Sequence, residues 1–102
     1  MSDVLPTAGE IRAATLSSPA ILVVEDSEAT AALYEEYLRS ADYRVKVAGT
    51  VAAALALLGT ERFDAVVLDL NLPDGNGLSV LKEIRRQGVP LETLVVTATG
   101  TL

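Results

Sequence analysis

The chain has 102 residues, half of them apolar, and carries a net charge of −6 with neither cysteine nor histidine. This length and composition predict one globular domain with a core of its own. The negative charge argues against non-specific nucleic-acid binding, and the missing residue types exclude disulfides, thiolate metal sites and catalysis by imidazole. A bound metal would need oxygen ligands, which favours a hard cation such as Mg²⁺.

The N-terminal part of the chain shows no targeting signal. It lacks the basic and apolar regions of a signal peptide, and the longest apolar run, residues 51–58, is far too short for a membrane span. We therefore expect a cytoplasmic protein that contacts no membrane. Residues 1–19 are rich in Ser, Thr, Pro and Gly, and we interpret them as an N-terminal extension, mobile or alternatively a docking arm. Residues 20–102 form the expected domain.

The first half of that domain alternates strands and helices. The apolar, β-branched run over residues 20–24 predicts a strand buried on both faces. Ser27 is placed to cap a helix, and apolar residues at helical spacing predict that helix over residues 28–41. Residues 44–48 alternate with period two, which is typical of a half-exposed strand near a sheet edge.

The second half continues the same alternation. Thr50 is expected to cap a helix whose apolar stripe covers residues 51–58, with Gly59 as its stop. The apolar run 65–70 predicts a central strand, and a turn rich in Pro, Asp and Gly follows it.

A third helix over residues 78–87 and a fourth strand over residues 93–97 complete the pattern. Strands and helices in alternation predict right-handed crossovers and an α/β fold with a doubly wound parallel sheet.

Parallel strands deliver their carboxyl ends to one edge of the sheet, where open α/β sheets place their ligands. This edge should gather Glu25 and Asp26 after the first strand, Asp69 at the end of the third and Thr97 at the end of the fourth. Three carboxylates about 5 Å apart repel one another by roughly 3 kcal/mol per pair at an effective dielectric near 20. A divalent cation or a proton would relieve this repulsion.

Each of these residues also has a purely structural interpretation. An acidic residue after a strand is usually a loop cap, an acidic residue before Ser27 favours a helix N-terminus, and Thr is a good strand former. The presence of acidic residues after the first and third strands together with Thr at the end of the fourth is much harder to explain by structural roles alone. We therefore predict that Asp69 is a nucleophile that accepts a phosphoryl group and that Thr97 donates its hydroxyl to that group.

Three motifs carry a resemblance to a known family: Val23-Val24-Glu25-Asp26-Ser27, Asp69-Leu70-Asn71-Leu72-Pro73-Asp74-Gly75-Asn76-Gly77 and Val95-Val96-Thr97-Ala98. Together they resemble the receiver domain of two-component response regulators. The resemblance implies a flavodoxin-like fold with strand order 2-1-3-4 in this chain. It also implies that a sensor histidine kinase or phosphotransfer protein phosphorylates Asp69.

The resemblance further implies the roles of individual residues. Glu25, Asp26 and Asp69 would bind Mg²⁺ together with the backbone carbonyl of Asn71, and Thr97 would be the switch hydroxyl. Such a domain is a phospho-acceptor switch rather than a turnover enzyme.

The sequence departs from the family at its C-terminal side. Complete receivers continue through a helix, a fifth strand that carries a lysine, and a last helix, whereas this sequence stops soon after its fourth strand. We expect a truncated receiver, a fragment of a transcriptional regulator. Its only lysines, Lys46 and Lys82, are not placed to replace the missing one. Strand 93–97 would then be an exposed edge that favours self-association.

Three other functions compete with the phospho-acceptor. A receiver-like interaction or dimerisation module that is not usefully phosphorylated remains an alternative, because the fifth-strand lysine is absent. A phosphatase with an aspartyl nucleophile commonly has a second acid two residues later, where this chain has Asn71. A nucleotide-binding Rossmann or P-loop domain needs a glycine-rich loop after the first strand, and none is present there.

Overall fold

The computed structural model describes residues 18–88 and 91–96. None of the helices in these residues is long and apolar enough to cross a membrane. The predictions for residues 1–17 and for Thr97 lie outside the described residues. The elements are, in order, β1 (Ala20–Val24), α2 (Glu28–Ser40), β2 (Arg44–Ala48), α3 (Val51–Thr60), β3 (Ala65–Asp69), β4 (Asn71–Leu72), β5 (Gly75–Asn76), α4 (Leu78–Gln87) and β6 (Glu92–Val96).

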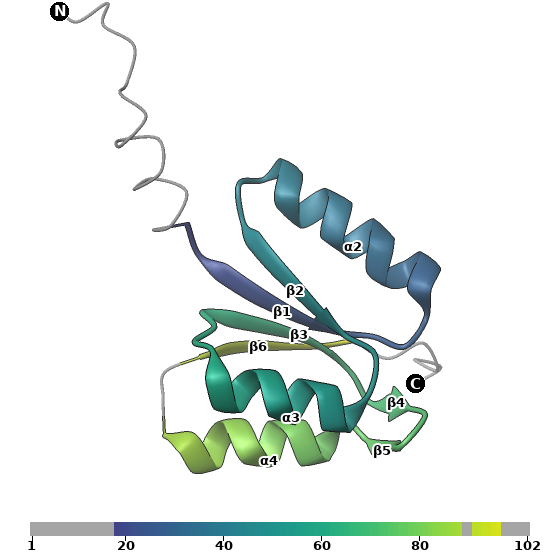
Figure 1. Cartoon of the computed structure of the whole chain (residues 1–102), viewed down its shortest axis with the longest axis vertical. Coiled ribbons are helices and arrows are strands. Elements are labelled where there is room, and N and C mark those ends of the chain that lie inside the picture. The colour runs from purple at the N-terminus through teal and green to yellow at the C-terminus, as the bar shows by residue number, and fades with distance from the viewer. Residues whose placement is uncertain (1–17, 89–90, 97–102) are drawn as a thin grey trace, which may run out of the picture.

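Four strands form a parallel sheet in the order β2-β1-β3-β6, which confirms the predicted order. Helix α2 lies on one side of this sheet, and α3 and α4 lie together on the other (Figure 1). The doubly wound α/β architecture predicted from the alternation of elements is therefore confirmed.

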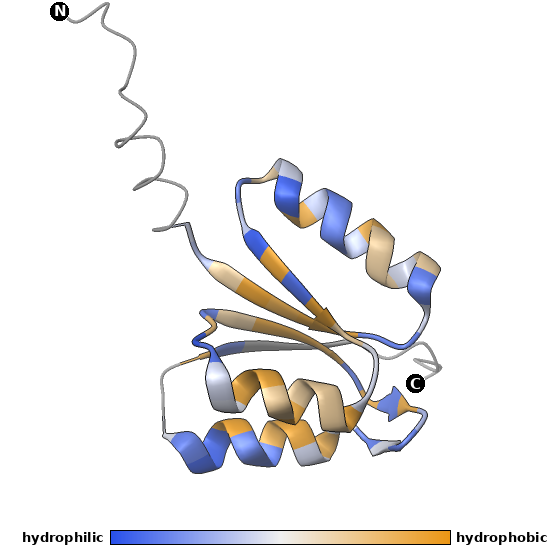
Figure 2. Cartoon of the chain, viewed as in Figure 1, coloured by the Kyte–Doolittle hydropathy of each residue, from blue (hydrophilic) through white to orange (hydrophobic). Residues whose placement is uncertain are grey.

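Strand β1 buries both of its faces, whereas β3 buries one face fully and the other in part, as central strands with helices on each side do. Along β1, Ala20, Leu22 and Val24 belong to the larger core under α3 and α4. Ile21 and Val23 belong to a smaller core under α2. The apolar colour along β1 and β3 in Figure 2 follows this double burial.

The outer strand β2 has a different pattern. Its polar and apolar residues alternate along the strand (Figure 2), and Val45 is buried while Arg44 and Lys46 are exposed. The prediction of a half-exposed edge strand is confirmed.

The helix starts follow the predicted capping. The Ser27 hydroxyl accepts a hydrogen bond from the Thr30 amide, and the Thr50 hydroxyl accepts one from the Ala53 amide. The predicted stop at Gly59 is wrong, because α3 runs through it to Thr60. The next amide, that of Glu61, still donates to the Leu57 carbonyl at 2.9 Å. A glycine weakens a helix interior by about 1 kcal/mol, which is too little to end a helix that packs on the core.

The turn after the central strand has more structure than the sequence predicted. Strand β3 ends at Asp69, one residue earlier than predicted, and the short strands β4 and β5 pair antiparallel before α4 begins. Gly77 closes this segment, and its amide donates to the Leu70 carbonyl at 2.9 Å. A Cβ atom at position 77 would lie 2.5 Å from the carbonyl oxygen of Asp69. Only glycine allows this close return of the chain to the end of β3.

Candidate functional site

The pairing of β1 with β3 places two acidic residues side by side. Val24 pairs with Leu68 across these strands, so the residues that follow them, Glu25 and Asp69, emerge at the same edge of the sheet. Asp26 comes next on the β1 side. One carboxylate oxygen from each of the three residues lies within 4.8 Å of the others. The structure therefore brings together the three acidic residues that the sequence singled out.

The three carboxylates differ in their surroundings. Asp69 is 5% exposed and Glu25 is 9% exposed, whereas Asp26 faces solvent. An Oδ1 atom of Asp69 accepts a hydrogen bond from the Asn71 amide at 3.0 Å. An Oε2 atom of Glu25 accepts one from the Ser27 amide at 3.1 Å. Backbone amides thus fix both buried side chains in orientation.

The pKa of Glu25 is raised above its usual value in this site. Burial is the largest cause, and the charge of Asp69 adds to it, while the hydrogen bond from the Ser27 amide acts in the opposite direction. Two carboxylates 4.8 Å apart repel by roughly 3 kcal/mol at an effective dielectric near 20. A cation bound among these oxygens would relieve that repulsion, and oxygen donors of this kind suit a hard divalent ion.

The predicted roles of two other site residues are not tested by the structure. Asn71 lies two residues after Asp69, at the start of β4, where it pairs with Asn76 of β5. The role of its carbonyl as a ligand stays a prediction. The role of Thr97 also stays a prediction, because this residue lies outside the described part of the chain.

Both lysines of the sequence lie away from the acidic cluster. The Lys46 ammonium is 4.0 Å from a carboxylate oxygen of Glu61, which follows the C-terminal end of α3. Lys82 is exposed in the middle of α4. Neither is among the residues that surround Asp69, as the sequence predicted.

Sequence reasoning missed one residue near the site. Asp74, in the turn between β4 and β5, accepts hydrogen bonds from the Val51 amide at 2.7 Å and the Ala52 amide at 3.0 Å. One local signal indicates this contact: the first turn of α3 contains no acidic residue of its own. The N-terminus of a helix attracts negative charge, so an acid from elsewhere in the chain was to be expected there.

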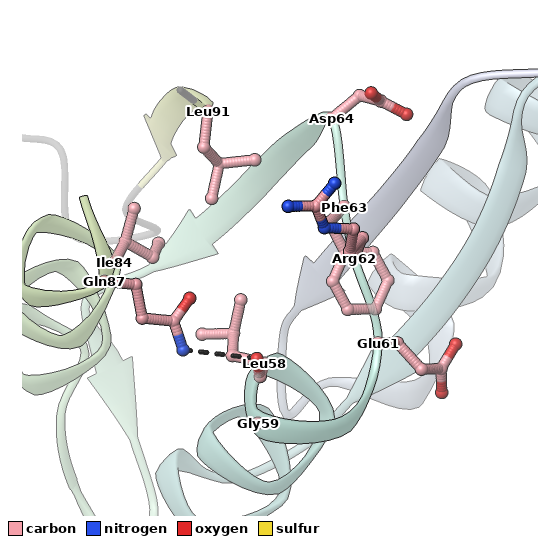
Figure 3. Close-up of a pocket in the computed structure, with 9 residues that line it drawn as sticks. All are labelled: Leu58, Gly59, Glu61, Arg62, Phe63, Asp64, Ile84, Gln87 and Leu91. Atoms are coloured by element: carbon pink, nitrogen blue, oxygen red, sulfur yellow. Dashed lines mark hydrogen bonds between the residues drawn. The ribbon is translucent and has the colours of Figure 1, made fainter. Parts of the chain in front are cut away.

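A separate pocket lies at the other end of the sheet, between the C-terminal ends of α3 and α4 (Figure 3). It has a volume of about 450 Å³ and contains none of the predicted site residues. Within it, the Gln87 side-chain amide donates to the Leu58 carbonyl at 3.2 Å and ties the two helices together. Its lining residues are Leu58, Gly59, Glu61, Arg62, Phe63, Asp64, Ile84, Gln87 and Leu91.

The fold and the acidic cluster can now be compared with known proteins. The model of the response regulator receiver domain matches residues 21–102. The chain belongs to this family, as its motifs predicted.

Individual relatives agree with this assignment. The transcriptional regulatory protein MalR of Bacillus subtilis is 33% identical over 84 residues, which cover 80% of this chain and 36% of MalR. The receiver domain of HemR from Leptospira biflexa is 40% identical to this chain with a TM-score of 0.76. The match covers 83% of this chain and 68% of the HemR chain. The chain spans between 18% and 36% of the length of four curated relatives that it matches.

Several solved relatives were determined with ligands bound. The response regulator TrrA of Thermotoga maritima is 30% identical to this chain with a TM-score of 0.75, over 80% of this chain and 71% of the TrrA chain. That structure is a complex with Mg²⁺ and a beryllium fluoride group.

Proposed function

We propose that this chain is a phospho-acceptor signalling domain, in which Asp69 receives a phosphoryl group from a phosphohistidine of a sensor kinase or phosphotransfer protein. The observation that carries the proposal is the position of the buried Asp69 carboxylate, within 4.8 Å of the Glu25 and Asp26 carboxylates at the carboxyl edge of a parallel sheet. Membership of the receiver family supports it.

The proposed transfer is a single displacement at phosphorus. An Oδ atom of Asp69 forms a bond to phosphorus while the phosphorus–nitrogen bond to the donor histidine breaks, and the electron pair of that bond stays on the imidazole nitrogen. The product is an acyl phosphate on Asp69. The Asn71 amide, 3.0 Å from Oδ1, holds the nucleophile in a fixed orientation during this step.

Charge is the main obstacle to this reaction, because an anionic group must approach three carboxylates. Glu25, Asp26 and Asp69, with the Asn71 carbonyl, are the residues that would hold Mg²⁺. When bound, the ion neutralises charge on the carboxylates and on the incoming phosphoryl oxygens. We assign the switch hydroxyl to Thr97, from the family resemblance.

The relatives support a proposal for the biological setting. MalR is a transcriptional regulatory protein, and this chain matches about a third of it. We propose that the domain acts in the cytoplasm, within a regulator of transcription, as a switch rather than as an enzyme that turns over substrate.

A small acyl phosphate such as acetyl phosphate tests the proposal without knowledge of the partner kinase. With Mg²⁺ present, the intact mass of the chain should increase by one phosphoryl group, and Asp69→Asn should remove this increase. Asp42→Asn is the matched control, because Asp42 is an exposed aspartate just after α2. An increase that persists in Asp69→Asn would show that the acceptor is another residue.

A second candidate function is an interaction module that self-associates without useful phosphorylation. It is favoured by the place of β6 at the edge of the four-stranded sheet, with no strand on its outer side within residues 18–88 and 91–96. Such an edge presents backbone N–H and C=O groups to a second chain. Sedimentation at tens of micromolar separates the two: a monomer that gains a phosphoryl group supports the first, and an unphosphorylated oligomer supports the second.

A further inference from the structure

Asp74 connects the segment that follows the acidic site to a helix far away in the sequence. Its Oδ1 atom accepts a hydrogen bond from the Val51 amide at 2.7 Å, and its Oδ2 atom accepts one from the Ala52 amide at 3.0 Å. Both oxygens of one carboxylate are thus used by the first turn of α3, which lies more than 20 residues earlier in the chain.

This contact completes the N-terminus of α3. The first amides of a helix have no partner within the helix, and the Thr50 hydroxyl accepts a hydrogen bond from the Ala53 amide alone. The two hydrogen bonds from α3 lower the pKa of Asp74, so its carboxylate is charged at neutral pH and interacts favourably with the helix N-terminus.

The same turn is joined to the acidic site. Strands β4 and β5 pair Leu72 with Gly75 and Asn71 with Asn76, so the turn residue Asp74 sits at the tip of a two-rung hairpin. Leu72 is buried in the larger core. At the base of the hairpin, the Asn71 amide donates to the Asp69 carboxylate. A displacement of the tip would therefore be transmitted to the backbone beside Asp69.

We infer that Asp74 is a positioning residue: by binding the hairpin tip to α3 it holds the Asn71 backbone against Asp69 and so strengthens cation binding at the acidic cluster. The inference rests on the proposed function, because it concerns the site at which Mg²⁺ would bind. Energetic coupling between two sites is reciprocal. The cation should therefore also strengthen the contact between Asp74 and α3.

The test compares two caps of the same helix in the full chain. Asp74→Ala and Thr50→Ala each remove hydrogen bonds from the start of α3, but only Asp74 also belongs to the hairpin of the site. We expect Asp74→Ala to raise the Kd for Mg²⁺, measured by calorimetry, about fivefold, the lower end of typical coupling between sites. Thr50→Ala should leave it within about twofold. Asp74→Asn, which keeps an oxygen acceptor, should fall between the two.

Amide hydrogen exchange gives a second test. If Asp74 only stabilised α3, Mg²⁺ would not change exchange at the start of this helix. Mg²⁺ should slow exchange at Val51 and Ala52 in the unchanged chain and in Thr50→Ala, but not in Asp74→Ala. Equal Kd values in Asp74→Ala and Thr50→Ala would overturn the positioning role and leave the metal site intact. A complete absence of Mg²⁺ binding in the unchanged chain would overturn both the proposed function and this inference.

Discussion

Two aspartates at opposite ends of β3 illustrate how one residue type serves two purposes. At the start of the strand, an Asp64 carboxylate oxygen accepts a hydrogen bond from the Ala20 amide at 2.8 Å and ties the beginning of β1 to the beginning of β3. At the end of the strand, Asp69 lies within 4.8 Å of two other carboxylates. Asp64 satisfies a backbone donor, whereas Asp69 is held among like charges.

The difference follows from the direction of the strands. At the amino end of a parallel sheet, the first strand residues offer backbone N–H groups that need acceptors, and Asp64 provides one. At the carboxyl end, the side chains that follow adjacent strands converge, and Glu25 is brought beside Asp69 in this way. Like charges that converge destabilise the metal-free domain, so their presence indicates function rather than stability.

The largest expected effect concerns packing at the carboxyl end. Gly77→Ala should destabilise the domain by about 3 kcal/mol, because a Cβ atom would lie 2.5 Å from the Asp69 carbonyl oxygen and 3.0 Å from Leu70 Cα. Chemical denaturation measures this loss. Gly59→Ala is the control: no atom lies within 4 Å of a Cβ atom there, so this helical substitution should stabilise by up to about 1 kcal/mol. Similar effects of the two substitutions would contradict this account of Gly77.

The second largest expected effect is the gain in stability on adding Mg²⁺, which should depend on Asp69 and not on Asp64. If Mg²⁺ binds at the acidic cluster, a concentration of about 100 times its Kd should stabilise the unchanged chain by about 2.7 kcal/mol. Asp69→Asn should remove most of this gain, and Asp64→Asn should preserve it. Thermal unfolding with and without Mg²⁺ measures both. An undiminished gain in Asp69→Asn would place the cation elsewhere.

The sequence predicted the elements with strong local signals and missed those that depend on distant contacts. The apolar run of β1 predicted both ends of that strand and the Ser27 cap predicted the start of α2, because side-chain pattern and capping are local properties. The stop at Gly59 was wrong because packing of α3 against the core outweighs the weak helix propensity of one glycine. The hairpin of β4 and β5 has strands of two residues, too short to show a period.

The acidic site could be predicted because two simple rules combine. Alternating strands and helices specify a parallel sheet, and a parallel sheet collects the residues that follow its strands at one edge. Glu25, Asp26 and Asp69 could be grouped on this basis alone. The first turn of α3 indicates only that an acid from elsewhere could bind there. That Asp74 is this acid could not be predicted, because nothing local in a Pro-Asp-Gly turn says that its carboxylate binds a helix 22 residues away.

In the metal-free chain, the two aspartates should have opposite effects on stability. Asp69→Asn should stabilise the domain by about 1 kcal/mol, because it removes part of a repulsion that solvent near the exposed Asp26 already weakens. Asp64→Asn should destabilise by up to about 1 kcal/mol, because a hydrogen bond to a charged acceptor becomes one to a neutral acceptor. Denaturation in the presence of a chelator measures both, and effects of equal sign would contradict the contrast between the two ends of β3.

The smallest effect is a change in the titration of Glu25. Its pKa is raised above the usual 4.5, first by burial and then by the charge of Asp69. The folded chain therefore binds more protons at this residue than the unfolded chain does. Its contribution to stability is greatest below the unfolded pKa and decreases as the pH rises through the folded pKa.

Carboxyl NMR titration of the metal-free chain resolves this group from the others. Glu25 must be resolved from the other carboxyl groups because Asp74 and Glu83 have lowered pKa values. Their contributions to stability are instead lost as the pH falls. Asp69→Asn should move the Glu25 midpoint downward without restoring it fully, since burial remains the larger cause. Asp64→Asn should leave it in place, because Asp64 lies at the other end of β3. A Glu25 midpoint that does not respond to Asp69→Asn would mean that the two carboxylates do not share one electrostatic site.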